Sequence, residues 1–253
     1  MALAHNLSSR VGSDAASRQC SLVREALVRD GLYEAAPHGD TTDAVGAGPA
    51  TTKWRIAPSP FLLSSDDLTF FRSLGNHLLA FYRALNRLYQ DSARGAQPSW
   101  VAAYLDQGKP ESLITFSRMK RFRDLLPGVI RPDVIPTEDG MVITELDSVP
   151  GGIGLTGSLS RAYAQLDAEQ TEGYEIIGGA DGMVQGFAAM LQRLLDSRSG
   201  CVAIVVSDEA NDYRPEIAWL AARLREQGIE AWCVEPREVR FTEESLVLTG
   251  EAG

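Results

Sequence analysis

Four charged residues in the middle of the sequence have the types and spacing of a site for a hard metal ion. Asp133 follows Arg131 by two positions, and Glu145 and Asp147 lie twelve and fourteen positions after Asp133. Carboxylate oxygens with no His or Cys nearby are typical ligands of Mg²⁺ or Mn²⁺, which also bind the phosphate oxygens of a substrate. Two or three of these carboxylates therefore predict a Mg²⁺ or Mn²⁺ site, and zinc is not expected.

A β-hairpin must bring these residues together. Residues 129–135 and 141–147 are short and rich in β-branched side chains, and Pro-Thr-Glu-Asp-Gly at 136–140 is typical of a hairpin loop. A five-residue loop would pair Asp133 with Ile143, and strand alternation would then place all four charged side chains on one face. A loop one residue longer or shorter would separate them.

The surroundings of this hairpin are open to two interpretations. Apolar residues on both of its faces predict that it is covered on both sides, where carboxylates need a paired charge or a metal ion. One arginine cannot neutralise three acids. Polar and apolar residues also alternate in a hairpin that faces solvent, and the acids would then be ordinary surface groups.

Hydrophobic periodicity predicts helices on both sides of the hairpin and strands after it. The expected helices span 16–30, 65–94, 100–105, 111–125, 155–166, 184–195 and 213–227, and the expected strands 201–206, 229–234 and 245–248. The apolar stripe from Phe71 to Leu88 is expected to be core. The strands at 201–206 and 229–234, with the helix between them, predict a βαβ unit and a parallel sheet of three strands that looks unfinished. Both strands are expected to be buried on both faces, with Cys201 and Cys233 as small core residues.

These elements predict an α/β protein in three segments. Residues 1–52 form a flexible N-terminal segment with one helix, in which 35–52 is a linker with almost no large apolar residue. Residues 53–198 hold the helical region and the metal-binding hairpin. Residues 199–253 form a partial Rossmann-like βαβ unit.

The run RPDVIPTEDGMVITELDSVPGG at 131–152 resembles the magnesium-binding segment of ATP-grasp ligases. That segment has an acid in one strand and Glu-x-Asn or Glu-x-Asp in the next. The Arg-x-Asp opening and the twelve-residue spacing are most similar to the glutathionylspermidine synthase-like, circularly permuted branch. The resemblance is specific over about residues 115–160 and lies mainly in layout over 200–250.

This resemblance implies roles for the hairpin residues. Asp133, Glu145 and Asp147 would hold Mg²⁺, and Arg131 would act in catalysis by contacting a phosphate or the acyl phosphate. Asp147 stands where the family often has Asn. The family's reaction is phosphorylation of a carboxylate by ATP, followed by attack of an amine or similar nucleophile.

Two further groups are candidates for binding the nucleotide. Arg118 and Lys120 belong to a basic cluster before the hairpin that could guide a polyphosphate to the metal, although a solvated helix face explains the same cluster. Gly151 and Gly152, in a turn before a helix, could present N–H groups to an anion, although plain turn formation explains them equally well.

Composition limits the partners. The chain has 34 acidic and 24 basic residues and a formal charge of −10, which disfavours nucleic acid and anionic membranes. Three scattered cysteines and the absence of an apolar leader favour a reducing cytoplasm. The expected partners are ATP and small carboxylate and amine substrates.

The sequence therefore predicts part of a Mg²⁺-dependent, ATP-grasp carboxylate–amine ligase. The lysine-bearing lid strands of such enzymes are expected after the βαβ unit, so the chain is expected to be incomplete, inactive alone and prone to form homo-oligomers. The alternatives are a non-catalytic protein that binds a metal, nucleotide or small molecule without the lid, and an interaction domain with an acidic surface hairpin.

Overall fold

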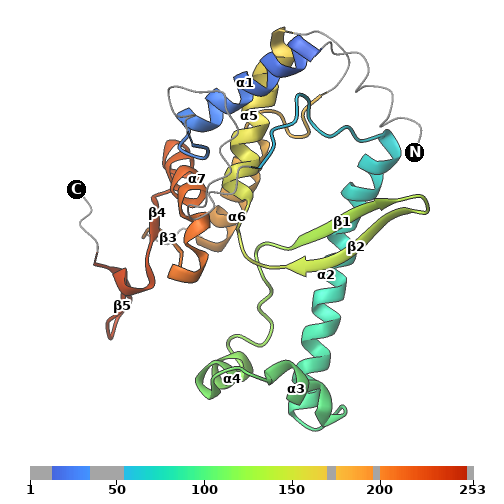
Figure 1. Ribbon diagram of the computed structural model, residues 1–253. Coiled ribbons are helices and arrows are strands. Elements are labelled where there is room, and N and C mark those ends of the chain that lie inside the picture. The colour runs from blue at the N-terminus through green and yellow to red at the C-terminus, as the bar shows by residue number, and fades with distance from the viewer. Residues whose placement is uncertain (1–12, 35–53, 170–174, 196–199, 250–253) are drawn as a thin grey trace, which may run out of the picture. The chain divides into compact units, whose positions relative to one another are not determined.

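The computed structural model describes residues 13–34, 54–169, 175–195 and 200–249 (Figure 1). The linker predicted at 35–52 and most of the N-terminal segment lie outside the described residues. The chain mixes helices with small two-stranded sheets, in agreement with the predicted α/β class. It divides into two compact units, one of Met1–Leu62 with Pro150–Gly253 and the other of Leu63–Val149. These boundaries differ from those of the three predicted segments.

The unit of residues 63–149 is built on one long helix. It contains helices α2 (Ser65–Ala93), α3 (Ser99–Asp106) and α4 (Glu111–Arg118), and strands β1 (Arg131–Thr137) and β2 (Gly140–Asp147). The Ser64 hydroxyl accepts the Asp67 N–H, and the Asp67 carboxylate accepts the Ser64 N–H, so α2 begins with a capping box. The predicted stripe is core only in part, because Leu74 and Leu78 are buried whereas Phe81 is 52% exposed.

Helix α4 ends at Arg118, seven residues before the predicted end. Side chains of α2 bind one carbonyl in the last turn of α4 and one in the segment that follows. Gln90 donates to the Ser117 carbonyl at 3.1 Å, and Asn86 donates to the Arg123 carbonyl at 2.6 Å. The Ser117 carbonyl, which would accept the Arg121 N–H if the helix continued, is satisfied by Gln90 instead, and residues 119–124 fold into turns.

The other unit is organised around helix α5. It contains α1 (Ser13–Arg29), α5 (Ile153–Glu169), α6 (Gly182–Leu195) and α7 (Arg214–Glu226). Helix α5 packs against α1, α6 and α7. One core cluster joins α1 to α5 and consists of Val23, Ala26, Leu27, Ala162, Tyr163 and Leu166.

The predicted βαβ unit is present. Strands β3 (Val202–Val205) and β4 (Ala231–Val234) are parallel neighbours joined through the 3₁₀ helix η1 (Asp208–Tyr213) and α7. Ile217, Leu220 and Leu224 are almost fully buried in α7, and α7 packs against β4.

The predicted three-stranded sheet is wrong. After β4, the 3₁₀ turn η2 (Pro236–Glu238) leads into β5 (Val239–Phe241), which pairs antiparallel with β6 (Leu246–Leu248). Within the described residues the last strand therefore belongs to a separate hairpin, and β3 and β4 form a pair of their own. The Thr242 N–H donates to the Ser245 carbonyl at 2.8 Å and closes this local hairpin.

Burial of β3 on both faces is also wrong. Ile204 is buried, but Val205 is 48% exposed and Cys201 is exposed, so the strand is covered on one face. Cys233 in β4 is half-buried, and burial raises the pKa of its thiol. Of the two cysteines, only Cys233 fits the predicted core role.

A buried carboxylate joins the start of α5 to the start of α7. Glu216 is 6% exposed, and its two carboxylate oxygens accept the N–H groups of Gly152 at 2.5 Å and Leu155 at 2.8 Å. We call this interaction the Glu216 clamp. Negative charge at a helix N-terminus satisfies N–H groups that have no partner within the helix and interacts favourably with the helix dipole.

Two glycines allow the helices to approach this closely. A Cβ atom on Gly154 would lie 2.1 Å from the Glu216 carbonyl oxygen, and one on Gly157 would lie 3.0 Å from the Trp219 ring. Neither glycine has a positive φ, so they are needed for space and not for backbone conformation. The clamp therefore requires Gly154 opposite Glu216.

Replacement of Glu216 by Ala is expected to lower the free energy of unfolding by about 2–4 kcal/mol, because it leaves two N–H groups at the start of α5 without their acceptor. Urea unfolding followed by circular dichroism measures the change. Glu230, an exposed residue before β4, is the matched control, and its replacement by Ala is expected to change stability by less than about 0.5 kcal/mol. Equal effects of the two substitutions would contradict the role of the clamp.

Candidate metal site

The hairpin forms, but its register differs from the predicted one. Asp133 pairs with Glu145, and Arg131 pairs with Asp147. The predicted pairing of Asp133 with Ile143 is wrong because the turn is only the two residues Glu138 and Asp139, which lie between β1 and β2.

A β-bulge restores the arrangement that the short turn would have destroyed. The observed loop is three residues shorter than the predicted one. This difference alone would move the charged residues of β2 to the opposite face. The register shifts between Asp133 and Val134, so Thr144 is one extra residue in β2. The Thr144 hydroxyl donates to the Asp133 carbonyl at 3.3 Å. Because directly opposed residues point to the same face, Arg131 and the three carboxylates share one face after all.

This face is open in the described structure. Asp133 and Glu145 are exposed, and Ile135 and Val142, which continue the same face, are 52% and 46% exposed. The predicted coverage of the hairpin on both sides is therefore wrong, and the exposure agrees with the alternative of a hairpin that faces solvent. The opposite face is the more enclosed one, since Val134 and Leu146 are half-buried there.

Asp147 and Arg131 organise the base of the hairpin. One carboxylate oxygen of Asp147 accepts the N–H groups of Ser148 at 2.6 Å and Val149 at 3.2 Å, and the other lies 3.5 Å from the Arg131 guanidinium. Arg131 also donates to the Val149 carbonyl at 3.3 Å. Both carboxylate oxygens of Asp147 thus already have partners, whereas the carboxylates of Asp133 and Glu145 are exposed at the surface.

A hydroxyl pair joins the base of the hairpin to the long helix. The hydroxyls of Tyr82 in α2 and Ser148 after β2 lie 2.8 Å apart. This contact holds the segment in which Asp147 makes its backbone hydrogen bonds.

The donor set fits Mg²⁺ bound by few protein ligands. Among residues 13–34, 54–169, 175–195 and 200–249, no group of three or more His, Cys, Asp or Glu side chains is arranged to hold a metal ion. Mg²⁺ usually takes one or two carboxylates and completes its octahedron with water and phosphate oxygens. The opposed pair of Asp133 and Glu145 supplies that number of hard oxygen ligands from one face.

The predicted anion site at Gly151 and Gly152 already contains an anionic group. The Gly152 N–H donates to Glu216, and Gly151 is buried. The Gly152 N–H thus faces a negative charge, and this charge is the protein's own carboxylate. A phosphate at the Gly152 N–H would have to displace it.

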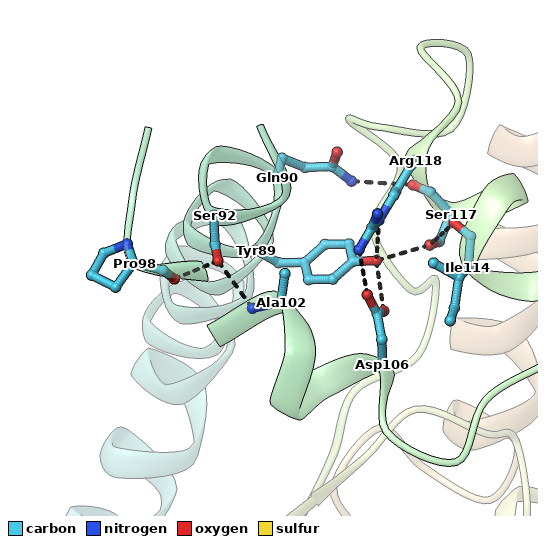
Figure 2. Close-up of polar contacts among 9 residues, drawn as sticks. All are labelled: Tyr89, Gln90, Ser92, Pro98, Ala102, Asp106, Ile114, Ser117 and Arg118. Carbon is cyan, nitrogen blue, oxygen red and sulfur yellow. Dashed lines mark hydrogen bonds and ion pairs between the residues drawn. The ribbon is translucent and has the colours of Figure 1, made fainter. Parts of the chain in front are cut away.

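Arg118 belongs to a hydrogen-bonded network at the end of α2 (Figure 2). Its guanidinium lies 2.5 Å from the Asp106 carboxylate and donates to the Tyr89 hydroxyl at 3.3 Å, while Tyr89 donates to Asp106 at 2.8 Å. The Tyr89 and Ser117 hydroxyls lie 3.2 Å apart. The hydrogen bond to Tyr89 raises the pKa of Arg118 above its usual value, and the hydrogen bond to Asp106 adds to this shift.

This network joins the ends of α3 and α4 to α2. The partners of Arg118 come from α2 and α3, so the structure gives it a packing role distinct from the four hairpin residues. Lys120 is exposed in the turns after α4. The eight predicted site residues therefore fall into three places: the hairpin face, the end of α4, and the start of α5.

Sequence reasoning missed three residues that shape these places. Glu216, Thr144 and Tyr82 each act through a partner distant in sequence or through a local register shift. The only sequence signal for Glu216 was an acid next to Pro215 at the start of a predicted helix, which is common at helix N-termini. Nothing in the sequence distinguishes Tyr82 from the other aromatic residues of α2.

Comparison with protein-family models finds no match, and comparison with curated protein sequences also finds none. The ATP-grasp resemblance thus depends on the residues of the hairpin and the following turn. In the described part of the chain, no helix combines the length and the apolar character needed to cross a membrane.

Replacement of Tyr89 by Phe is expected to lower the free energy of unfolding by about 1 kcal/mol, because it removes the hydroxyl that joins Asp106, Ser117 and Arg118. Tyr104, which is 72% exposed on α3, provides the control, and its replacement by Phe is expected to have no measurable effect. Denaturant unfolding monitored by far-UV circular dichroism compares the two. A Tyr89→Phe protein as stable as the Tyr104→Phe protein would contradict the packing role of the network.

Proposed function

We propose that this chain is the metal- and substrate-facing part of an ATP-grasp, Mg²⁺-dependent carboxylate–amine ligase. The observation that carries the proposal is the observed register of the hairpin. Despite a shorter turn than expected, the bulge at Thr144 places Arg131, Asp133, Glu145 and Asp147 on one accessible face. The same residues carry the sequence resemblance to the magnesium-binding segment of that family.

In this proposal, Asp133 and Glu145 are the main metal ligands. Their carboxylates are directly opposed and exposed, so they can reach an ion that arrives with a nucleotide. Asp147 has a supporting role, because its oxygens already interact with the Ser148 and Val149 N–H groups and with Arg131. The bound ion would neutralise charge on the phosphates of ATP and orient them.

Arg131 would contact the transferring phosphoryl group or the acyl phosphate. Its position beside the carboxylates suits that role, because a guanidinium can bind phosphate oxygens through two parallel N–H groups. To do so it would exchange part of its contact with Asp147 for a contact with phosphate. The 3.5 Å separation of that ion pair and its partial exposure fit such an exchange.

The partial Rossmann-like unit and the βαβ layout belong to the same proposal. Strands β3 and β4 are parallel and joined by α7, which fits the nucleotide-binding architectures of this class. The proposed reaction joins a carboxylate to an amine after activation of the carboxylate by ATP. The proposed location is the cytoplasm.

Titration calorimetry with Mn²⁺, with and without ATP, tests the site. The parent protein is expected to bind Mn²⁺ weakly alone and more tightly with ATP, because phosphate oxygens complete the ligand shell. Asp133→Ala and Glu145→Ala are each expected to weaken Mn²⁺ binding about tenfold or more, which corresponds to about 1.4 kcal/mol or more. Asp147→Asn is expected to have a smaller effect.

Glu138→Gln is the matched control, since Glu138 is an exposed acid in the turn of the same hairpin. It is expected to bind Mn²⁺ as the parent does. If Asp133→Ala and Glu145→Ala also bind Mn²⁺ like the parent, the assignment of the metal ligands is wrong.

A further inference from the structure

The two short helices that follow α2 expose large apolar side chains, three of them aromatic. Trp100 and Tyr104 of α3 are 67% and 72% exposed, and Leu113 and Phe116 of α4 are 52% and 54% exposed. We call these four residues the α3–α4 surface. Exposed clusters of large apolar side chains are uncommon on soluble monomers and mark sites of association, and Trp and Tyr are enriched among the residues that contribute most to binding.

This surface lies on a firmly held base. On the side of α3 away from Trp100 and Tyr104, Val101 and Ala102 are buried. The Ser92 hydroxyl accepts the Ala102 N–H at 3.0 Å, and the Tyr89 network holds the ends of both helices (Figure 2). The exposed aromatic side chains therefore project from an ordered support, so little ordering of the backbone would be needed on binding.

The charges around the α3–α4 surface are basic, unlike the chain as a whole. Residues 99–124, which carry α3 and α4, contain five Lys and Arg against three Asp and Glu, and two of these acids are in ion pairs, Asp106 with Arg118 and Asp124 with Arg123. Lys120 and Arg121, which follow α4, are exposed. A partner that covers the aromatic residues should therefore be acidic.

The tip of the hairpin has the complementary character. Residues 132–147 contain five acidic and no basic residues. At the tip, Glu138 and Asp139 are exposed, and beside them Ile135 and Val142 are 52% and 46% exposed. The tip and the α3–α4 surface belong to the same unit and are both exposed, so they do not cover each other within one molecule.

We propose that the α3–α4 surface of one molecule docks onto the hairpin tip of a second copy of this chain. Because each copy carries both surfaces, a two-fold axis lets the contact form twice and close the pair. The exposed parts of Trp100, Tyr104 and Phe116 amount to roughly 300–500 Å², taking about 150–250 Å² for each full aromatic side chain. This is about half of the roughly 800 Å² that each partner contributes to a stable interface, and the tip supplies further area.

The charged turn of the hairpin lies away from the candidate metal ligands. Glu138 lies five residues beyond Asp133 along the strand, or about 16 Å at about 3.3 Å per residue. Ile135 is two residues from Asp133 on the same face, or about 7 Å, so a contact that covers Ile135 borders the face of the candidate metal ligands. This proposal does not depend on the proposed ligase function.

Sedimentation velocity of the full chain tests the docking. The parent is expected to dimerise in the micromolar range and to dissociate as the salt concentration rises, because charges contribute to the contact. A Trp100→Ala, Tyr104→Ala double variant is expected to raise the dimer dissociation constant at least tenfold. A parent protein that stays monomeric at 100 μM would overturn the proposal, as would a parent-like dimer of the double variant.

Charge reversal gives a sharper test. The variant Lys120→Glu, Arg121→Glu has two acidic surfaces, and the variant Glu138→Lys, Asp139→Lys has two basic ones, so each alone is expected to be monomeric. An equimolar mixture is expected to form dimers again, because both contacts of the mixed pair join opposite charges. All changed residues are exposed, and circular dichroism verifies that each variant is folded. If the mixture does not associate while the parent does, a different surface mediates the dimer.

Discussion

The Glu216 clamp is the interaction on which the larger unit depends most. Its carboxylate satisfies two N–H groups at the start of α5, and α5 is the helix against which α1, α6 and α7 pack. The clamp also requires a close approach that only Gly154 allows, since a Cβ there would overlap the Glu216 backbone. A buried charge with good hydrogen bonds at a helix N-terminus is favourable, whereas the same charge without them is costly. One acidic residue thereby couples the turn after the hairpin to the helix of the βαβ unit.

The hairpin is governed by a different constraint, the number of residues between its paired strands. A two-residue turn and one extra residue at Thr144 each reverse the face on which the acids of β2 lie, and together they leave the acids beside Asp133. A bulge next to a group of charged residues is typical of functional sites, because it redirects side chains without lengthening the turn. The ion pair of Arg131 with Asp147 and the hydroxyl pair of Tyr82 with Ser148 then hold the base of the hairpin.

The sequence predicted local structure well and long-range contacts poorly. Helices α2 and α7 followed from apolar spacing and caps, and β3 and β4 from short β-branched runs, since these signals lie within a few residues. The four charged residues were predicted on the correct face although the register was wrong. The turn is three residues shorter than predicted and the bulge adds one residue, and the two shifts cancel because each reverses the face. The role of Glu216 could not be predicted, since its partners at Gly152 and Leu155 lie more than sixty residues away. The separate β5–β6 hairpin was missed because a short strand pattern does not specify its partner.

The proposed role of Asp133 and Glu145 is to bind a divalent ion together with nucleotide phosphates. Electron–nuclear double resonance on Mn²⁺ and ATP with protein carrying ¹³C in its Asp and Glu carboxyl groups tests this most directly. We expect ¹³C coupling from protein carboxylates and ³¹P coupling from phosphates on the same Mn²⁺ ion, with the ¹³C coupling reduced in Asp133→Ala. A spectrum identical to that of Mn²⁺ with ATP in buffer would show that these carboxylates do not bind the ion.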